Sequence, residues 1–231
     1  MRHAVIVTAA GSSRRFNGPE NASKKEFVHI EGESVLCRAI RPFLASEGLC
    51  ALVVTYRKED LQTTQKLVET LDTTGVRVLY VEGGATRQES VFNGLKALYD
   101  LRDALDIQLV SIHDGARPFV DTALVDRCLE AAARTGGACP CLPVTDTIVK
   151  VSEDGLLQSR IDRDGVFTVQ TPQTFRFPDI YLAHCRARSD VAYTDDTEIF
   201  LHWGGSVACI EGSTGNRKIT FAKDIPDRRH S

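Results

Sequence analysis

Short apolar runs alternate with amphipathic segments along most of this chain. Residues 4–8, 52–55, 76–81 and 109–113 are mostly apolar and have the length of strands. The segments between them repeat apolar residues every three or four positions, which is typical of helices. Strands that are apolar throughout predict a parallel sheet covered on both faces, because a strand with one wet face would alternate. We therefore expect an α/β fold with a doubly wound, mostly parallel, Rossmann-like sheet.

Polar residues mark where several helices begin and end. Ser34 is placed to cap a helix over residues 35–45, and Asp121 is placed to cap another that Gly136 ends. The same patterns predict further elements toward the end of the chain, namely helices near 178–188 and 195–203, a strand at 207–211 and a short strand at 218–220.

The pattern changes between residues 144 and 169. Polar, β-prone residues are interrupted there by turn signals at 153–155 and 163–165, which predict a hairpin outside the main sheet. An isolated two-stranded hairpin is only marginally stable in water, so it needs a packing partner. We expect a single domain over residues 1–231 whose arm, at about 144–168, contacts a second subunit in a homodimer.

The composition of the chain limits the kinds of binding partner that we expect. The chain has 231 residues and a formal net charge of -3, which gives no general attraction to nucleic acid or to an anionic membrane. The apolar run at 4–8 is far shorter than the ~18 residues of a membrane helix. An odd number of cysteines, seven, predicts reduced thiols and a cytoplasmic location. Cys139 and Cys141 form a close pair, which favours packing over metal binding because no further ligands follow at suitable spacing.

The loop after the first strand combines small residues with positive charge. Ala9, Ala10 and Gly11 let backbone N–H groups approach an anion, and two arginines and two lysines follow before residue 26. The loop matches neither the dinucleotide-binding nor the P-loop pattern. Its position after a first parallel strand predicts a polyphosphate site, and the alternative is a solvated basic turn.

Two further loops follow the carboxyl ends of strands. The segment from Gly84 through Ala85 to Ser90 opens a helix, where free N–H groups could receive a base or a phosphate; alternatively, Ser90 only caps the turn. Asp114 ends an apolar strand, and a carboxylate there suits Mg²⁺. The alternative is that Asp114 pairs with Arg117 in a structural turn. Both roles can hold, because a neighbouring arginine keeps the carboxylate ionised. His113 is expected to be a hydrogen-bonding residue at the strand end.

At these residues the sequence resembles the 2-C-methyl-D-erythritol 4-phosphate cytidylyltransferases of non-mevalonate isoprenoid biosynthesis. The resemblance covers essentially the whole chain and rests on motifs that occur in order, at residues 9–15, 25–27, 83–91, 113–118, 146–147, 171–173 and 216–220. It implies an enzyme that transfers CMP from CTP to methylerythritol phosphate and releases pyrophosphate, with Mg²⁺ or another divalent cation.

The resemblance also implies roles for individual residues. Catalytic contacts to the α-phosphate and triphosphate would come from Arg15, Lys25 and Lys218, and the nucleotide would be held by Ala9, Ala10, Gly11, Gly84, Ala85 and Ser90. The acceptor would meet Asp114, which also helps to hold the metal, together with Arg117, Thr194, Lys218 and Thr220. Thr147 and Arg163 would reach the acceptor phosphate from the arm of the neighbouring subunit.

Several positions depart from the family pattern. Lys24 stands where proline commonly precedes the lysine, so Lys24 and Lys25 both remain candidates, although Glu26 and Phe27 favour Lys25. The stretch 16–24 is longer than usual, and we hypothesise that it is a lid that orders on nucleotide binding. Gly215 replaces an acidic residue, and an extra residue in the arm precedes Lys150.

The chemistry agrees with the resemblance. A phosphate monoester acceptor is largely ionised above its second pKa of about 6, so it needs no general base. Catalysis must instead offset the repulsion between two anions, which requires cations. Rival interpretations are a ribitol 5-phosphate cytidylyltransferase, a metal-dependent glycosyltransferase using the Asp-x-Asp motif of Asp162 and Asp164, and a nucleotide-binding module without catalysis.

Overall fold

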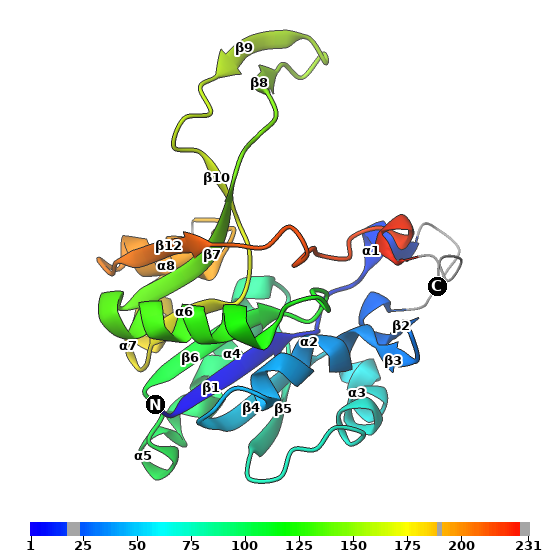
Figure 1. Ribbon diagram of the computed structural model, residues 1–231, viewed down its shortest axis with the longest axis vertical. Helices are drawn as coiled ribbons and strands as arrows, with labels where there is room; N and C mark the ends of the chain where they lie inside the picture. The colour runs from blue at the N-terminus through cyan, green and yellow to red at the C-terminus, as the bar shows by residue number, and fades with distance from the viewer. Residues whose placement is uncertain (18–23, 189–190, 227–231) are drawn as a thin grey trace.

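The computed structural model describes residues 1–17, 24–188 and 191–226 (Figure 1). Its main sheet has the strand order β10-β7-β11-β6-β1-β4-β5, with β12 paired to β7. The strands are β1 (His3–Thr8), β4 (Leu49–Tyr56), β5 (Arg77–Glu82), β6 (Leu109–Asp114), β7 (Gly137–Pro143), β10 (Phe167–Val169), β11 (Gln173–Arg176) and β12 (Val207–Glu211). Only β10 and β11 run antiparallel to their neighbours in this sheet. The expected mostly parallel α/β sheet is confirmed.

Helices cover both faces of the sheet, as Figure 1 shows. One face carries α2 (Val35–Leu44), α3 (Leu61–Val68) and α6 (Thr122–Thr135), and the other carries α4 (Arg87–Tyr99), α7 (Asp179–Cys185) and α8 (Asp196–His202). Side chains of β1 alternate between the two cores, with Val5 and Val7 in one and Ala4 and Ile6 in the other. Burial on both faces explains why this strand is apolar throughout.

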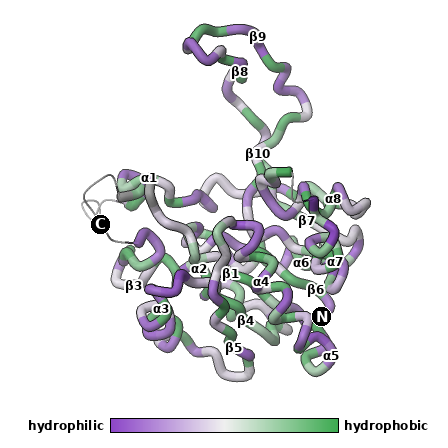
Figure 2. Tube along the Cα trace, turned by 180° about the vertical axis from the view of Figure 1, so that it is seen from behind, coloured by the Kyte–Doolittle hydropathy of each residue, from purple (hydrophilic) through white to green (hydrophobic). Residues whose placement is uncertain are grey.

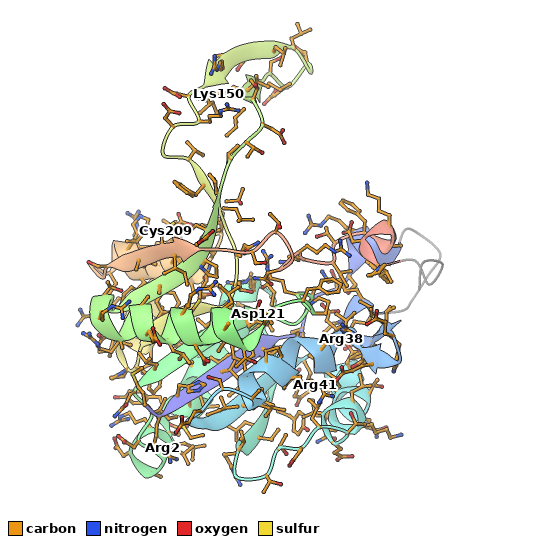
Figure 3. The ribbon with its side chains drawn as sticks, in the orientation of Figure 1. Arg2, Arg38, Arg41, Asp121, Lys150 and Cys209 are labelled. Atoms are coloured by element: carbon orange, nitrogen blue, oxygen red, sulfur yellow. The ribbon has the colours of Figure 1, made fainter. Side chains whose placement is uncertain are left out.

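The predicted helix caps are present. The side chain of Ser34 accepts the backbone N–H of Cys37, and Asp121 accepts that of Leu124 at the start of α6, where Figure 3 labels it. Gly136 ends α6 with a φ of +98°, a conformation that favours glycine. The helices α7 and α8 and the strand β12 also lie where the sequence predicts them.

The prediction of a short strand at residues 218–220 is wrong. That segment has no regular structure, and its one backbone bond to the body runs from the N–H of Ile219 to the carbonyl of Ala116, at 2.8 Å. Ile219 is fully buried against Ile30 and Val35, so its apolar character reflects loop packing rather than sheet pairing. The remaining short elements are α1 (Arg14–Asn17), η1 (Lys25–Phe27), β2 (His29–Ile30), β3 (Glu33–Ser34), η2 (Lys58–Asp60), α5 (Arg102–Leu105) and η3 (Ala222–Asp224).

An arm rises away from the body of the molecule. Its strands β8 (Ile148–Val151) and β9 (Leu157–Ile161) form a separate antiparallel sheet whose register shifts next to Lys150, and β10 ties the base of the arm to β7. Figure 2 shows apolar stretches on the arm as well as in the body. Leu156 and Leu157 are 68% and 74% exposed. The predicted hairpin is confirmed, whereas its role in dimerisation stays a prediction.

Across the described ranges, no helix is both long and apolar enough to cross a bilayer. The hypothesis of a nucleotide-ordered lid over 16–24 falls mainly on residues 18–23, which lie outside the described part of the chain.

Candidate active site

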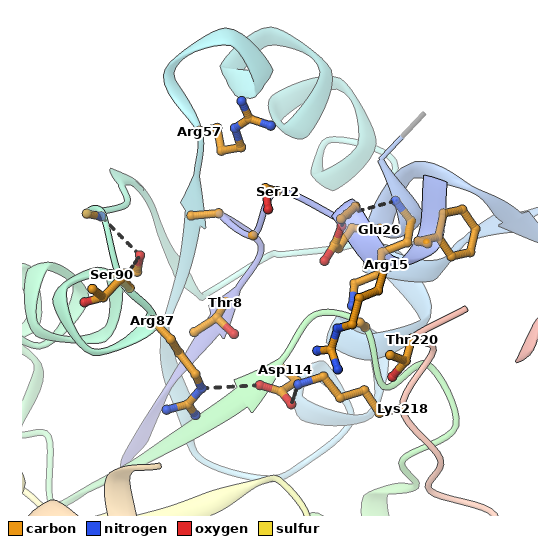
Figure 4. A pocket seen from close by; sticks show the side chains of 18 of the residues that line it. Thr8, Ser12, Arg15, Glu26, Arg57, Arg87, Ser90, Asp114, Lys218 and Thr220 are labelled. Atoms are coloured by element: carbon orange, nitrogen blue, oxygen red, sulfur yellow. Dashed lines mark hydrogen bonds and ion pairs between the residues drawn. The ribbon is translucent and has the colours of Figure 1, made fainter. Parts of the chain in front are cut away.

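A cavity of about 770 Å³ opens at the carboxyl ends of the parallel strands. Thr8 is the last residue of β1 and Asp114 is the last residue of β6, and both side chains face this cavity (Figure 4). Its lining consists of Thr8, Ala10, Gly11, Ser12, Ser13, Arg15, Phe16, Lys25, Glu26, Arg57, Gly84, Ala85, Thr86, Arg87, Ser90, Asp114, Ala116, Lys218 and Thr220. The loops singled out from the sequence therefore meet in one pocket, as expected for a doubly wound sheet.

The first loop lines one wall of the pocket. A Cβ on Gly11 would meet nothing within 4 Å, so the small residue leaves open space that a ligand can enter. Ser13 has a φ of +50° and donates its hydroxyl to Glu26 Oε2 at 3.2 Å, which braces the turn. Burial raises the pKa of the Glu26 carboxyl, although Lys25 and Lys24 oppose this shift.

Ala9, which was predicted to bind the nucleotide, does not line the pocket, and its part in nucleotide binding stays a prediction. Its side chain is buried in the core, and its N–H lies 3.1 Å from the carbonyl of Thr55 on β4. The backbone donor of Ala9 is therefore committed to the sheet, and the cradle begins at Ala10.

The two adjacent lysines point to different partners. Lys25 lines the pocket and donates to the carbonyl of Ile219 at 3.0 Å, whereas Lys24 Nζ pairs with Asp60 Oδ2 at 2.7 Å outside the lining. Burial lowers the pKa of Lys25 and the nearby Lys218 adds to the shift, although Glu26 opposes it. The pocket therefore contains Lys25, as the motif at 25–27 favoured.

The loop before α4 is closed by its own side chains. Thr86, not Ser90, caps the helix by accepting the N–H of Glu89. Ser90 Oγ instead accepts the N–H of Gly84 at 3.1 Å, and Glu89 Oε2 accepts that of Ala85 at 2.6 Å. These N–H groups are thus already bonded, and the expectation that they are free to bind a ligand is wrong for Gly84 and Ala85.

The first loop and this second loop are in close contact. A Cβ built on Gly83 would lie 2.3 Å from the Cβ of Ala10, so a larger residue at either place would push the two walls apart. Ala10, Gly84, Ala85 and Ser90 still line the cavity, in agreement with their predicted place in a nucleotide site.

Asp114 lies among three cations. Lys218 Nζ is 2.7 Å from Oδ2, Arg87 Nε is 3.6 Å from Oδ1, and Arg117 Nε is 3.7 Å from Oδ2. Burial alone would raise the pKa of Asp114, but the charges of Lys218, Arg87 and Arg117 outweigh it and hold the pKa well below its usual range. The pocket therefore contains an ionised carboxylate paired with positive charge.

His113 has the structural role expected of it. Its Nδ1 lies 3.0 Å from the hydroxyl of Thr171, and its Nε2 donates to the carbonyl of Arg117 at 3.2 Å. Burial lowers the pKa of His113 to about 4, so the ring is neutral at pH 7. Neutral and fully buried, His113 organises the strand end and does not line the pocket.

The carboxyl-terminal segment adds Lys218 and Thr220 to the pocket wall. Asn216 is buried and donates its side-chain amide to the carbonyl of Thr171 at 2.8 Å, while Arg117 Nη1 donates to the carbonyl of Asn216 at 2.8 Å. Arg117 thus lies behind Asp114 and outside the lining. These bonds fix the segment that carries Lys218.

Three further residues assigned to the acceptor do not line the cavity. Thr147 and Arg163 belong to the arm, and the guanidinium of Arg163 donates to the carbonyl of Thr145. Thr194 precedes α8 and bonds Glu198 Oε2 through both its N–H and its hydroxyl. None of the three lines the pocket of its own chain.

The arm also contains Asp162 and Asp164 of the Asp-x-Asp motif. The N–H of Asp164 bonds Asp162 Oδ1 at 3.2 Å in an exposed turn between β9 and β10, and neither aspartate lines the pocket. This placement removes the observation that favoured a glycosyltransferase. Within the described ranges, no three His, Cys, Asp or Glu residues are grouped as metal ligands.

Arg57, Arg87, Ser12, Ser13 and Glu26 line the pocket although the sequence did not assign them to it. Arg87 belonged to the motif at 83–91, and its charge in a loop after a strand was a usable signal. Ser12, Ser13 and Glu26 also belonged to motifs named from the sequence, at 9–15 and 25–27, whereas Arg57 lies outside all of them and gave no signal.

Comparisons with known proteins agree with this geometry. The family model for 2-C-methyl-D-erythritol 4-phosphate cytidylyltransferase (IspD) matches residues 3–227. The chain is 39% identical over 229 residues to a bifunctional enzyme IspD/IspF of Chelativorans sp. (strain BNC1), which covers 97% of this chain and 53% of that protein. It is 33% identical to a 2-C-methyl-D-erythritol 4-phosphate cytidylyltransferase of Clostridium novyi (strain NT), covering 97% of this chain and 94% of that one.

Solved structures show the same fold. The crystal structure of 4-diphosphocytidyl-2C-methyl-D-erythritol synthase from Anaerococcus prevotii DSM 20548 aligns with a TM-score of 0.81 and 27% identity, over 97% of this chain and 92% of that one. The chain spans about half the length of the bifunctional relatives it matches.

Proposed function

This chain belongs to the 2-C-methyl-D-erythritol 4-phosphate cytidylyltransferase family, and on that premise we propose that it transfers CMP from CTP to 2-C-methyl-D-erythritol 4-phosphate. The products are 4-diphosphocytidyl-2-C-methyl-D-erythritol and pyrophosphate. The observation that carries the proposal is the convergence of Arg15, Lys25 and Lys218 on one pocket whose other wall is the loop from Gly84 to Ser90.

The residues of this pocket suit attack by one anion on another. Arg15, Lys25 and Lys218 supply positive charge for the triphosphate and for the pentavalent transition state. The acceptor phosphate is already ionised, so the reaction needs no proton acceptor, and the neutral, buried His113 is consistent with that. Lys218 contacts Asp114 at 2.7 Å, which holds its ammonium beside that carboxylate in the pocket wall.

We propose that a divalent cation, Mg²⁺, binds at Asp114. The carboxylate is ionised, and its Oδ1 lies 3.6 Å from Arg87, beyond the usual range of a hydrogen bond. One carboxylate is sufficient for Mg²⁺ when substrate phosphates and waters complete the shell. When bound, the cation neutralises phosphate charge and polarises the α-phosphoryl group.

We propose further that two chains form a homodimer through the arm. Val151, Leu156 and Leu157 are more than half exposed on β8, β9 and the turn between them, an apolar surface that a partner would cover. In such a dimer, Thr147 and Arg163 would reach the acceptor phosphate in the partner's pocket. The cytoplasmic location predicted from the cysteines is likewise a proposal.

The acceptor separates this function from that of a ribitol 5-phosphate cytidylyltransferase. We expect the purified chain, given CTP and Mg²⁺, to release pyrophosphate with methylerythritol phosphate and not with ribitol 5-phosphate. Pyrophosphate release and mass spectrometry of the nucleotide product provide the measurement. Turnover of ribitol 5-phosphate alone would overturn the acceptor assignment. If CTP is not consumed with either acceptor or without one, the proposal that the chain is an enzyme is overturned.

A further inference from the structure

Arg87 links the pocket to a second, buried carboxylate. Its Nε lies 3.6 Å from Asp114 Oδ1 in the pocket, and its Nη1 lies 2.8 Å from Asp196 Oδ2. Figure 4 shows the Arg87 side chain extending from the start of α4 to Asp114, with Lys218 on the opposite side of that carboxylate. The order of charges is therefore Lys218, Asp114, Arg87 and Asp196.

Asp196 is fully buried and held from several elements. It is the first residue of α8, its Oδ1 accepts from His184 Nε2 of α7 at 3.1 Å, and its N–H donates to Gln173 Oε1 of β11 at 3.1 Å. Burial alone would raise the pKa of Asp196, but the charge of Arg87 and the hydrogen bond from His184 outweigh it and lower the pKa. A charged group is thus fixed behind the pocket without lining it.

The contact has a geometric consequence for Arg87. A guanidinium is planar, so a carboxylate that holds its Nη1 also limits where the other two nitrogens point. Desolvating a carboxylate is costly, and a buried ion pair adds little net stability compared with apolar packing. A fully buried Asp196 is therefore better explained by the orientation it imposes than by the stability it adds.

We propose that Asp196 and His184 are positioning residues that hold Arg87, and that Arg87 in turn holds Asp114 between itself and Lys218. The inference deepens the proposed function and rests on it for the identity of the reaction. Neither Asp196 nor His184 lines the pocket. They act through Arg87 on the carboxylate that faces the ligands.

The kinetic test uses Asp196→Asn, which removes the charge and keeps the shape. We expect kcat to fall about 10- to 100-fold, the usual effect of losing an outer-shell partner. The KM for CTP should change less than about threefold, because the triphosphate contacts come from the first loop and Lys218. Asp121→Asn, another aspartate at a helix start but remote from Arg87, is the matched control and should leave kcat unchanged.

A double-mutant cycle separates positioning from general damage to the fold. Since Asp196→Asn and Arg87→Lys interrupt the same link, the double variant should lose little more activity than the worse single variant. The proposal would be overturned if the loss of kcat in the double variant equalled the product of the two single losses. It would also be overturned if Asp196→Asn lowered the melting temperature but kept the unmodified kcat below that temperature.

A second readout does not depend on turnover. The ¹⁵N-detected Nε–H signal of Arg87, assigned by its loss in Arg87→Lys, should be sharp in the unmodified chain and in Asp121→Asn, and broadened in Asp196→Asn. An unchanged Arg87 signal in Asp196→Asn contradicts the positioning role whatever reaction the protein catalyses. Failure of the unmodified chain to turn over CTP would overturn the proposed function and leave this spectroscopic result to decide the inference.

Discussion

Replacing Lys25 by alanine is expected to lower kcat about 10²- to 10³-fold, the effect of removing one preorganised charge from a transition state. Lys25 lies in the pocket near Arg15, Asp114 and Lys218, as the mutual influence of these groups on its pKa indicates. Its loss would remove one of the three cations that we propose stabilise the developing charge on the α-phosphoryl group. Steady-state pyrophosphate release at saturating CTP measures the change.

Lys24→Ala is the matched control, because the two lysines are adjacent and only one faces the cavity. Removing Lys24 breaks its ion pair with the largely buried Asp60, which should cost about 1–3 kcal/mol of stability, seen as a lower melting temperature. Below that temperature kcat should stay within a few-fold of the unmodified value. A larger kcat loss in Lys24→Ala than in Lys25→Ala would reverse the assignment.

Deleting residues 146–165 is expected to give a monomer that has lost nearly all activity. The deletion removes the exposed apolar strands of the arm together with Thr147 and Arg163, the residues proposed to bind the acceptor phosphate in the partner's pocket. Light scattering reports the oligomeric state, and acceptor-dependent pyrophosphate release reports the activity. A well-folded, active monomer would contradict both parts of this proposal.

Mixing two variants tests whether the arm acts on the partner. Arg163→Ala should keep the dimer and weaken acceptor binding, while Lys25→Ala inactivates its own pocket. After subunit exchange in an equal mixture, one pocket in each heterodimer contains both residues, so about a quarter of the full activity should return at limiting acceptor. Mixtures no more active than the two variants measured separately would show that Arg163 does not act across the interface.

Much of the fold follows from local patterns. The uninterrupted apolar run of β1 predicts burial on both faces, and Ser34 and Asp121 predict helix starts because a side-chain oxygen there can accept a free N–H. The antiparallel strand β11, by contrast, lies between β6 and β7, and its pairing joins residues about sixty positions apart. No pattern within the four residues Gln173–Arg176 encodes that insertion.

The site, like the fold, has some features that local sequence patterns predict and others that depend on long-range contacts. The loops at residues 9–15 and 83–91 could be predicted to meet because carboxyl ends of parallel strands share one edge. Which of Lys24 and Lys25 faces the pocket depends on the direction each takes from the short helix η1, with Asp60 binding one and Ile219 the other. The commitment of the Ala9 N–H to Thr55, and the contact of Arg87 with Asp196, are likewise long-range and have no local signal.

The most direct measurement of the central claim is a crystal structure of the full chain with CTP and Mg²⁺. The account predicts the triphosphate within about 3.5 Å of the side chains of Arg15, Lys25 and Lys218, the usual limit of a hydrogen bond, with the cytosine against the loop from Gly84 to Ser90. It also predicts the metal beside Asp114. A nucleotide bound outside this pocket, or a triphosphate that contacts none of these three cations, would contradict it.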